Sequence, residues 1–385
     1  MGRLRAFRSS TFMMNYPSIL RFGAVLIFWW YWILNGAYSS YRLTKSYGKR
    51  VRIETGIHEV RQFLWQWWWA IWYSIQPKEF YAFALYRKEN AALLGQFLYL
   101  FETGGYSGVK TGSPELQIAA SKKAFAAFCT KHNLPCVSHR AIGGRAGEIT
   151  VSDMLEECLQ APFFLKPVSG YGGRENFIVK ADGDGIVLED ADGLARVLSR
   201  NEAEEVLQRR FRRQEYLAQP LLCNHRDLQG FSLKGISTLR VITLLTKPGS
   251  NASYFMAALQ VPRSKDDNIS NRGFFCPVDE VTGVLGKGLR PVVMSSISSF
   301  HPDSGVIFEG RKVPCWEEAK TLAINAHTRL QAFSSLAWDI AITNKGLFLL
   351  ETNLGWGAGI MQRSFEVPLG ETAFPTLVAN YLEIR

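Results

Sequence analysis

A pair of short apolar segments near the C-terminus, carrying acidic and amide side chains, constrains this chain more than any other feature. Residues 338–353 predict two strands joined by a three-residue loop at 344–346, which ends in the glycine that such loops favour. In that register Asp339 lies opposite Glu351 on one face of the sheet, and Asn353 points the same way. Hard oxygen ligands of this kind suit Mg²⁺. The alternative is an edge hairpin facing water, but a carboxylate inside an apolar strand usually has a partner.

A glycine-rich segment follows an apolar strand in the middle of the chain. Residues 163–165 lead into Lys166, and the run Ser-Gly-Tyr-Gly-Gly-Arg occupies 169–174. Backbone N–H groups of such a turn can approach phosphate oxygens closely, and the lysine adds a positive charge. The segment matches neither a P-loop nor a dinucleotide-binding fingerprint. A flexible turn without a ligand is the alternative.

Periodicity predicts the remaining elements in outline. An amphipathic helix covers 122–132, and further helices are expected at 78–101, 148–160, 190–200 and 316–331. A small sheet is expected from strands at 163–168, 176–180 and 185–189. A second lobe would hold strands at 238–246, 252–261, 335–343 and 347–352. Residues 214–217 are interpreted as a linker between the lobes, and 263–272 as a polar loop.

The order of these pieces resembles the ATP-grasp superfamily, and within it the branch associated with sugar transfer. The resemblance covers roughly residues 75–380, and the motifs that carry it lie at 79–81, 164–167, 237–240, 277–283, 301–303, 314–319 and 338–341. It implies an α+β architecture, a two-lobed ATP-grasp fold behind a helical, aromatic-rich N-terminal extension. The expected divisions are a membrane-associating region 1–75, a helical segment 76–120, a lobe 121–215 with the glycine-rich loop, and a lobe 216–385 with the metal-binding strands.

The same resemblance implies roles for individual residues. Arg240 would steady the transferred phosphoryl group, with Lys166 as its catalytic partner. One or two Mg²⁺ ions, with Mn²⁺ as the alternative, would be held by Asp339, Glu351 and Asn353. The residues expected to bind ATP are Lys122, Lys166, Ser169, Gly170, Gly172, Gly173, Glu215, Tyr216 and Leu217.

Charge and aromatic residues concentrate at the N-terminus. Residues 1–61 hold ten Arg or Lys against two Glu, a net of +8 out of +10 for the whole chain, and eight of the eleven tryptophans fall between Trp29 and Trp72. Such unevenness argues against a nucleic-acid partner and favours a membrane surface. The uncharged run 22–38 would span the membrane, lie in its interface, or pack on the enzyme as a soluble helix. The six cysteines form no C-x-x-C pair, so a zinc site and a disulfide framework are not expected.

The resulting hypothesis is an ATP-dependent ligase that releases ADP and joins a carboxylate to an amine through an acylphosphate. The acceptor would be a small molecule or a glycan-linked group in cell-surface polysaccharide assembly, handled at the cytoplasmic face of the membrane. Two alternatives stay open. One is a kinase that phosphorylates a hydroxyl, and the other is a non-catalytic nucleotide-binding scaffold at the membrane. Neither substrate is readable from the loops that would build the acceptor pocket.

Overall fold

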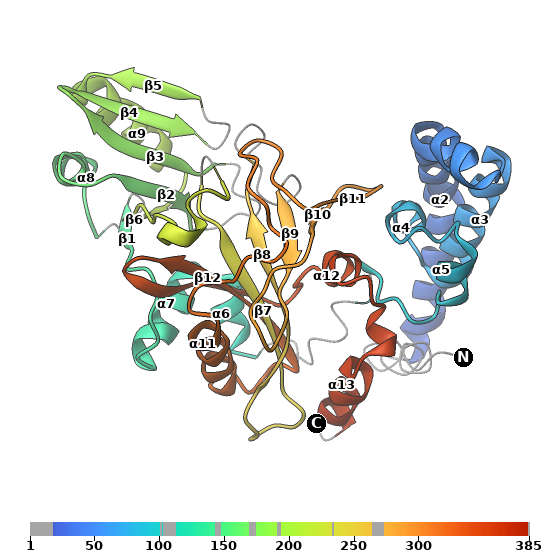
Figure 1. Cartoon of the computed structure of the whole chain (residues 1–385). Coiled ribbons are helices and arrows are strands. Elements are labelled where there is room, and N and C mark those ends of the chain that lie inside the picture. The colour runs from blue at the N-terminus through green and yellow to red at the C-terminus, as the bar shows by residue number, and fades with distance from the viewer. Residues whose placement is uncertain are drawn as a thin grey trace.

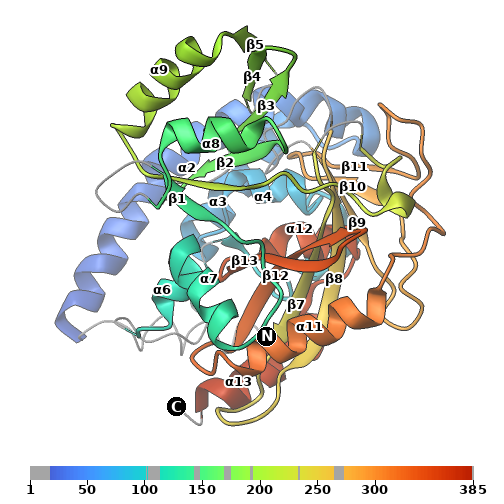
Figure 2. The ribbon, with the colours of Figure 1, turned by 90° about the vertical axis from the view of Figure 1, so that its left-hand side faces the viewer.

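The chain folds into two sheets and a separate group of N-terminal helices (Figure 1). The computed structural model describes residues 18–100, 102, 113–142, 148–168, 175–190, 194–232, 235–263 and 273–383. Both sheets are antiparallel throughout their paired strands. The smaller sheet lies above the larger one in both views, and the N-terminal helices flank the larger sheet (Figures 1 and 2).

The first lobe is built on a six-stranded sheet with the order β1-β6-β2-β3-β4-β5. Its strands are β1 (Arg140–Ile142), β2 (Phe163–Pro167), β3 (Phe177–Asp182), β4 (Gly185–Asp190), β5 (Ala195–Leu198) and β6 (Tyr216–Pro220). Two helices, α8 (Val151–Cys158) and α9 (Arg200–Phe211), pack on one face. Alternating residues of β2 explain the arrangement, because Phe163 and Leu165 enter the core while Lys166 faces the other way.

The second lobe is built on a seven-stranded sheet with the order β11-β10-β9-β8-β7-β12-β13. Its strands are β7 (Thr238–Leu244), β8 (Ser253–Val261), β9 (Phe274–Pro277), β10 (Gly288–Arg290), β11 (Ser296–Ser298), β12 (Ser335–Thr343) and β13 (Gly346–Asn353). A short 3-10 turn, η2 (Arg226–Leu228), precedes β7, and another, η3 (Leu369–Glu371), lies near the C-terminus.

Helices cover both faces of the larger sheet. The small residues Ala319, Ala323 and Ala326 let α11 (Trp316–Thr328) pack closely on one face. The opposite face packs against α12 (Ala358–Ser364) and α13 (Phe374–Glu383). In β12 the alternation separates Trp338 and Ile340, which enter the core under α11, from Asp339, which lies on the α12 side.

Two helices cross from the first half of the sequence to the second lobe. These are α6 (Leu116–Ala120) and α7 (Lys122–Lys131), and both pack beside β13. Phe125 and Phe128 of α7 enter the core of the larger sheet. Ser121 caps α7 by accepting a hydrogen bond from the Ala124 N–H group, which fixes the first turn that carries Lys122.

The N-terminal helices form a hairpin with a polar centre. The antiparallel helices α2 (Ser18–Thr55) and α3 (Glu59–Tyr73) are followed by α4 (Pro77–Ala82) and α5 (Lys88–Ala92). Buried Gln66 donates to the Thr44 hydroxyl at 2.9 Å, and the Tyr81 hydroxyl donates to the Gln62 amide oxygen at 3.0 Å. These hydrogen bonds fix the register of the pair, although the amide oxygen of Gln66 has no partner among the described residues. Across the described segments, no helix is both long enough and apolar enough to cross a membrane.

The structure differs from the sequence prediction in three places. A continuous helix over 78–101 is wrong, because the chain turns at Ala84 (φ 47°) between α4 and α5. A helix over 190–200 is also wrong: β4 ends at Asp190, β5 covers Ala195–Leu198, and the capping box formed by Ser199 with Glu202 starts α9 at residue 200. Residues 216–220 form a strand between β1 and β2 rather than a linker, so the first sheet extends beyond the expected boundary at 215.

Close packing of one turn against α11 gives a testable prediction. A Cβ added at Gly283 (φ +70°) would lie 2.7 Å from the Trp316 ring, whereas one added at Gly249 (φ +83°) would meet nothing within 4 Å. We expect Gly283→Ala to lower the free energy of unfolding by about 2–4 kcal/mol and Gly249→Ala by only about 1 kcal/mol. Urea unfolding of both variants measures the difference. Equal losses would show that the ring moves aside freely.

Candidate active site

The β12–β13 hairpin brings the two predicted carboxylates together by a different route from the expected one. Thr343 pairs with Gly346, so the loop has two residues and the three-residue loop is wrong. The extra residue sits instead at Leu350, where the register shifts between the Asp339–Glu351 and Ile340–Leu349 pairs. Asp339 therefore does lie directly opposite Glu351, because a bulge of one residue compensates for a loop shorter by one.

An arginine of the neighbouring strand binds the carboxylate of Asp339 through two hydrogen bonds. Arg240 of β7 stands opposite Asp339 in register, and its Nε and Nη2 donate to the two carboxylate oxygens at 2.8 and 2.7 Å. Both side chains are largely buried. The Nδ2 of Asn353 donates to Asp339 and to Glu351, each at 3.2 Å. One cation and one amide thus hold two acids together in a poorly hydrated place.

The acids are not fully neutralised by these contacts. Burial, with the negative charge of Asp339 beside it, raises the pKa of Glu351 above its usual range. Burial is the largest single influence on Arg240 and would lower its pKa, but the charge and hydrogen bonds of Asp339, together with the charge of Glu351, outweigh it and the pKa is raised. A carboxylate whose charged form is disfavoured by its surroundings is stabilised when a further cation arrives.

The donor set fits a metal ion only with the help of a ligand. Within the described residues no cluster of three or more His, Cys, Asp or Glu side chains could hold a metal. Asp339 and Glu351 offer two carboxylates, and Asn353 would have to turn its amide so that the oxygen faces them. Mg²⁺ is commonly bound by one or two carboxylates together with substrate phosphates and water, so this set fits a metal–nucleotide complex better than a free ion.

Two lysines approach these acids from the first lobe and from α7. Lys122 donates its Nζ to the Pro167 carbonyl at 3.3 Å, next to Lys166 in β2. Burial, with the positive charge of Lys122, lowers the pKa of Lys166 to about 8, while Glu351 across the lobe junction opposes that shift. The two lysines predicted to bind phosphate therefore lie close together, and the charge of Glu351 acts on Lys166.

The strand β6 presents one face toward the lobe junction. Tyr216 points the other way and packs with Phe177 and Phe211 in the first core, so its side chain does not share the Lys166 face. Leu217 pairs with Lys166 in register and is buried on that face. Residues on the same side of β6 alternate with Tyr216, which predicts that Glu215 and Gln219 accompany Leu217.

Two acceptor atoms beside Leu217 have no hydrogen-bond partner among the residues that the structure describes. These are the buried Oε1 atoms of Glu215 and Gln219. Buried polar atoms are normally paired, so an unpaired one invites a donor from a ligand. Gln219 was absent from the sequence prediction, although its i+2 and i+4 spacing from Leu217 and Glu215 was the available signal.

Other neighbours of the site were also missed by sequence reasoning. Cys136 and His139 lie close enough to Lys166 for its charge to lower their pKa values, although burial is the larger cause for His139 and a hydrogen bond from Cys129 for Cys136. Gln260 of β8 lies beside Arg240, and its amide oxygen accepts from the guanidinium at 2.8 and 3.2 Å when the amide is turned to face it. No motif marked these three positions. The glycine-rich positions Ser169, Gly170, Gly172 and Gly173 lie outside the described residues.

Comparison with known proteins identifies the family of this chain. The model of the sugar-transfer associated ATP-grasp family matches residues 114–376, and the chain belongs to that family. No curated protein matches the chain. The two-lobed α+β fold, with its helical N-terminal region, is the one expected from the sequence.

Several solved structures resemble the chain distantly. D-cycloserine synthetase DcsG is 13% identical, with 71% of this chain and 72% of that chain covered and a TM-score of 0.37. An L-amino acid ligase from Bacillus licheniformis is 11% identical, with coverages of 70% and 52% and a TM-score of 0.38. N5-carboxyaminoimidazole synthetase from Staphylococcus aureus complexed with ADP is 11% identical, with coverages of 62% and 45% and a TM-score of 0.36. The chain thus spans less than half the length of that synthetase.

The depressed pKa of Lys166 predicts a stability effect with a definite sign. In the unfolded chain a lysine titrates near its ordinary pKa of about 10.4, so between about pH 8 and pH 10 the unfolded state binds more protons and stability rises with pH. At pH 7 the folded protein carries the cost of the buried charge. We expect Lys166→Met to raise the free energy of unfolding by roughly 1–3 kcal/mol at pH 7, and to lose more than about half of that gain by pH 9.5.

Urea unfolding of Lys166→Met at the two pH values measures the effect. Lys123→Met is the matched control, since Lys123 is exposed on the same helix as Lys122. A gain at pH 7 that is equally large in the control, or one that grows with pH, would contradict the assignment of a buried cation to Lys166.

Proposed function

We propose that this ATP-grasp protein is an ATP-dependent carboxylate–amine ligase. The observation that carries the proposal is the meeting of two lysines with two carboxylates and an arginine at the junction of the lobes. Lys122 reaches the Pro167 carbonyl from α7, and Lys166 is attracted by Glu351 of the opposite lobe. Membership of an ATP-grasp family supports ATP as the nucleotide. The two lysines supply positive charge to bind its phosphates.

ATP would lie between the sheets with its phosphates at the lysines. Lys122 and Lys166 would bind phosphate oxygens, and the backbone of Ser169, Gly170, Gly172 and Gly173 would close over them. Leu217 would contact the adenine ring, and the free acceptor atoms of Glu215 and Gln219 would receive hydrogen bonds from the amino group or the ribose. Tyr216 would contribute through its backbone, because its side chain belongs to the first core.

Asp339, Glu351 and, after its amide turns, Asn353 would hold Mg²⁺. When bound, the metal neutralises charge on the phosphates and orients them for in-line transfer. Arg240 would remain attached to Asp339 through one edge and direct its remaining Nη1 at the transferred group. A preorganised cation of this kind stabilises developing charge without reorganising.

The reaction balances in two steps. A carboxylate oxygen of the substrate attacks the γ-phosphorus of ATP, the bond to the β–γ bridging oxygen breaks, and ADP leaves with that electron pair. The nitrogen of an amine then attacks the acylphosphate carbon, loses a proton, and expels inorganic phosphate. Both nucleophiles in this scheme come from the substrates, so the protein has only to position them and to stabilise charge.

The acceptor is proposed to belong to cell-surface glycan assembly at the cytoplasmic face of a membrane. The exposed side of α3 supports this location, because Val60, Leu64, Trp68 and Trp72 recur every four residues and are 49–59% exposed. Exposed basic residues of α2 flank the hairpin, and they are Arg42, Lys45, Lys49, Arg50 and Arg52. An apolar aromatic stripe beside basic charges suits the interface of an anionic bilayer.

The catalytic proposal predicts ADP release that needs two substrates. We would incubate the full chain and Mg²⁺-ATP with sugar acids or amino acids as carboxylates, and with amino acids or amino sugars as amines, and measure ADP and the joined product. We expect Asp339→Asn and Glu351→Gln each to lower the rate roughly a hundredfold or more. The control Asp227→Asn changes an exposed carboxylate and should leave the rate unchanged.

Product identity separates the outcomes of this experiment. ADP formed together with a phosphorylated hydroxyl and no amide would replace the ligase by a kinase. ATP binding without ADP release under every substrate pair would favour the scaffold. No ATP binding at all would overturn the proposal.

The location predicts binding to anionic lipid through α3. We expect the double change Trp68→Ser with Trp72→Ser to reduce co-flotation with phosphatidylserine vesicles about tenfold. Leu194→Ser with Val197→Ser removes two equally exposed apolar side chains from the first lobe and serves as the control. Equal flotation of all three proteins, or binding to neutral vesicles alone, would contradict the proposed surface.

A further inference from the structure

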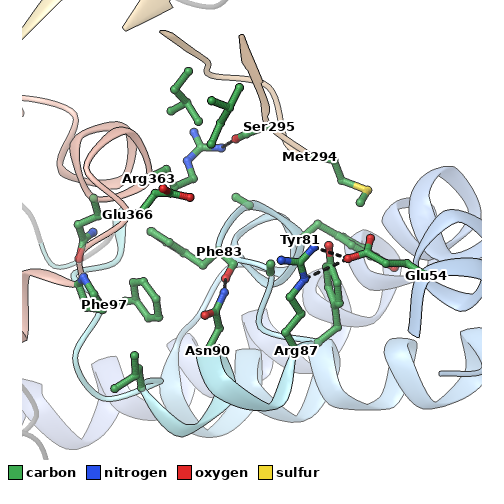
Figure 3. Close-up of a pocket in the computed structure, with 18 of the residues that line it drawn as sticks. Glu54, Tyr81, Phe83, Arg87, Asn90, Phe97, Met294, Ser295, Arg363 and Glu366 are labelled. Atoms are coloured by element: carbon green, nitrogen blue, oxygen red, sulfur yellow. Dashed lines mark hydrogen bonds and ion pairs between the residues drawn. The ribbon is translucent and has the colours of Figure 1, made fainter. Parts of the chain in front are cut away.

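A cavity separates the N-terminal helices from the second lobe. Its volume is about 590 Å³, which lies within the range of small-molecule sites. The N-terminal wall comes from α2, α4, α5 and the turns around them, and the opposite wall from β10, β11 and α12 (Figure 3). The N-terminal wall lies outside residues 114–376, so it is an addition to the family's shared part.

The two ends of the cavity differ in chemistry. The aromatic residues Tyr81, Phe83, Tyr86 and Phe97 line the N-terminal side with apolar atoms, although each is only 2–7% exposed. Arg363 of α12 stands across from them beside Ser295 (Figure 3). Three arginines and two glutamates line the whole cavity, a net charge of +1. A partly aromatic lining with a net positive charge suits a ring that bears an anionic group.

Arg363 is held rigidly and keeps one nitrogen available. Its Nε donates to the Gly359 carbonyl at 3.1 Å, and its Nη1 donates to the Val292 carbonyl at 2.8 Å and to the Ser295 hydroxyl at 2.7 Å. Those contacts leave Nη2 without an acceptor among the described residues. Guanidinium groups fixed in this way lose little entropy when they bind a carboxylate.

The charge of Arg363 also lacks a direct counterion. No carboxylate oxygen of the described residues lies within 4.0 Å of it, whereas Arg87, also in the cavity lining, is paired with Glu54, and the third arginine, Arg50, is exposed to solvent. Burial lowers the pKa of Arg363 to about 10, with Glu79 opposing the shift at longer range. The side chain is therefore still a cation at neutral pH. A partly desolvated cation without a close acid is stabilised by an incoming anion.

Backbone strain also occurs at this place. Two of the five non-glycine residues with positive φ among those described, Ala84 (47°) and Glu366 (55°), line this cavity. A left-handed alanine costs about 1 kcal/mol or more, and such strain tends to persist where the surroundings require a particular shape. Here it shapes the two facing walls.

The cavity is distinct from the site at the lobe junction. The helix α12 lies between them, with Gly357 at its start near the Arg240 guanidinium and Arg363 at its end in the cavity. Neither Lys166 nor any of the predicted metal ligands lines the cavity. A ligand in this cavity would therefore not contact the proposed catalytic residues and could affect them only indirectly, through α12.

We propose that this cavity binds a small molecule in which a carboxylate is attached to a ring, with the carboxylate on Nη2 of Arg363 and the ring against Phe83 and its aromatic neighbours. The ring is that of an aryl acid or of a sugar acid, since both stack on aromatic side chains. This second site does not depend on the ligase proposal, because it needs neither ATP nor metal.

Calorimetric titration of the full chain without nucleotide tests the site. The probes are benzoate and D-galacturonate, each beside its neutral counterpart, benzyl alcohol and D-galactose. We expect saturable binding of one acid, and at least about tenfold weaker binding of its neutral counterpart. The acid that binds identifies the ring. Two variants follow with that acid: Arg363→Gln, which removes the cation, and Leu93→Trp, which fills the cavity without touching Arg363. Arg209→Gln, an exposed arginine of α9, is the control.

The variants separate a ligand site from a structural role. We expect at least about tenfold weaker binding in both Arg363→Gln and Leu93→Trp, and unchanged binding in Arg209→Gln. Leu93→Trp decides the matter alone if Arg363→Gln does not fold. The proposal is overturned if neither acid binds, if the neutral compounds bind as well as the acids, or if the tryptophan leaves binding unchanged.

Discussion

The pairing of Arg240 with Asp339 is the interaction on which the organisation of this molecule depends. Two adjacent central strands of the larger sheet each place a charged residue at the same level, and neither charge would be tolerated there alone. Because the pair is bidentate and buried, it fixes the guanidinium and the carboxylate to each other and to the sheet. Glu351, Asn353 and Gln260 lie around this rigid centre, and Lys166 of the first lobe and Lys122 of α7 lie near it.

Charge balance explains why the junction of the lobes suits a metal–nucleotide complex better than a nucleotide or a metal ion alone. Burial and the charge of Lys122 lower the pKa of Lys166, and burial and the charge of Asp339 raise the pKa of Glu351. Each side is unfavourable in isolation. Phosphates would stabilise the charged lysines, and a divalent cation would stabilise the charged acids. A metal–nucleotide complex supplies both at once.

Local patterns in the sequence were sufficient for much of this centre. Alternation in β12 and β13 predicted that Asp339 and Glu351 would be neighbours, and helical periodicity predicted α7, while the role of Lys122 came from the family resemblance. The hairpin loop was predicted wrongly, because a bulge at Leu350 and a longer loop give the same pairing and periodicity cannot distinguish them. Residues 214–217 were read as a linker, since a short strand between β1 and β2 is defined by partners distant in sequence. The cavity around Arg363 had no signal at all, because its walls meet only through the tertiary fold.

The position of α7 has a consequence for how the chain can be synthesised and folded. Phe125 and Phe128 pack into the core of the larger sheet beside β13, more than 200 residues later in the chain. A ribosome therefore releases these side chains long before their partners exist. The six-stranded sheet, which ends at Pro220, has all its strands once that residue emerges, while α6 and α7 must wait for the last strand. Completion of the second lobe is thus a late, long-range closure, and the interval before it is when this protein most needs protection from aggregation.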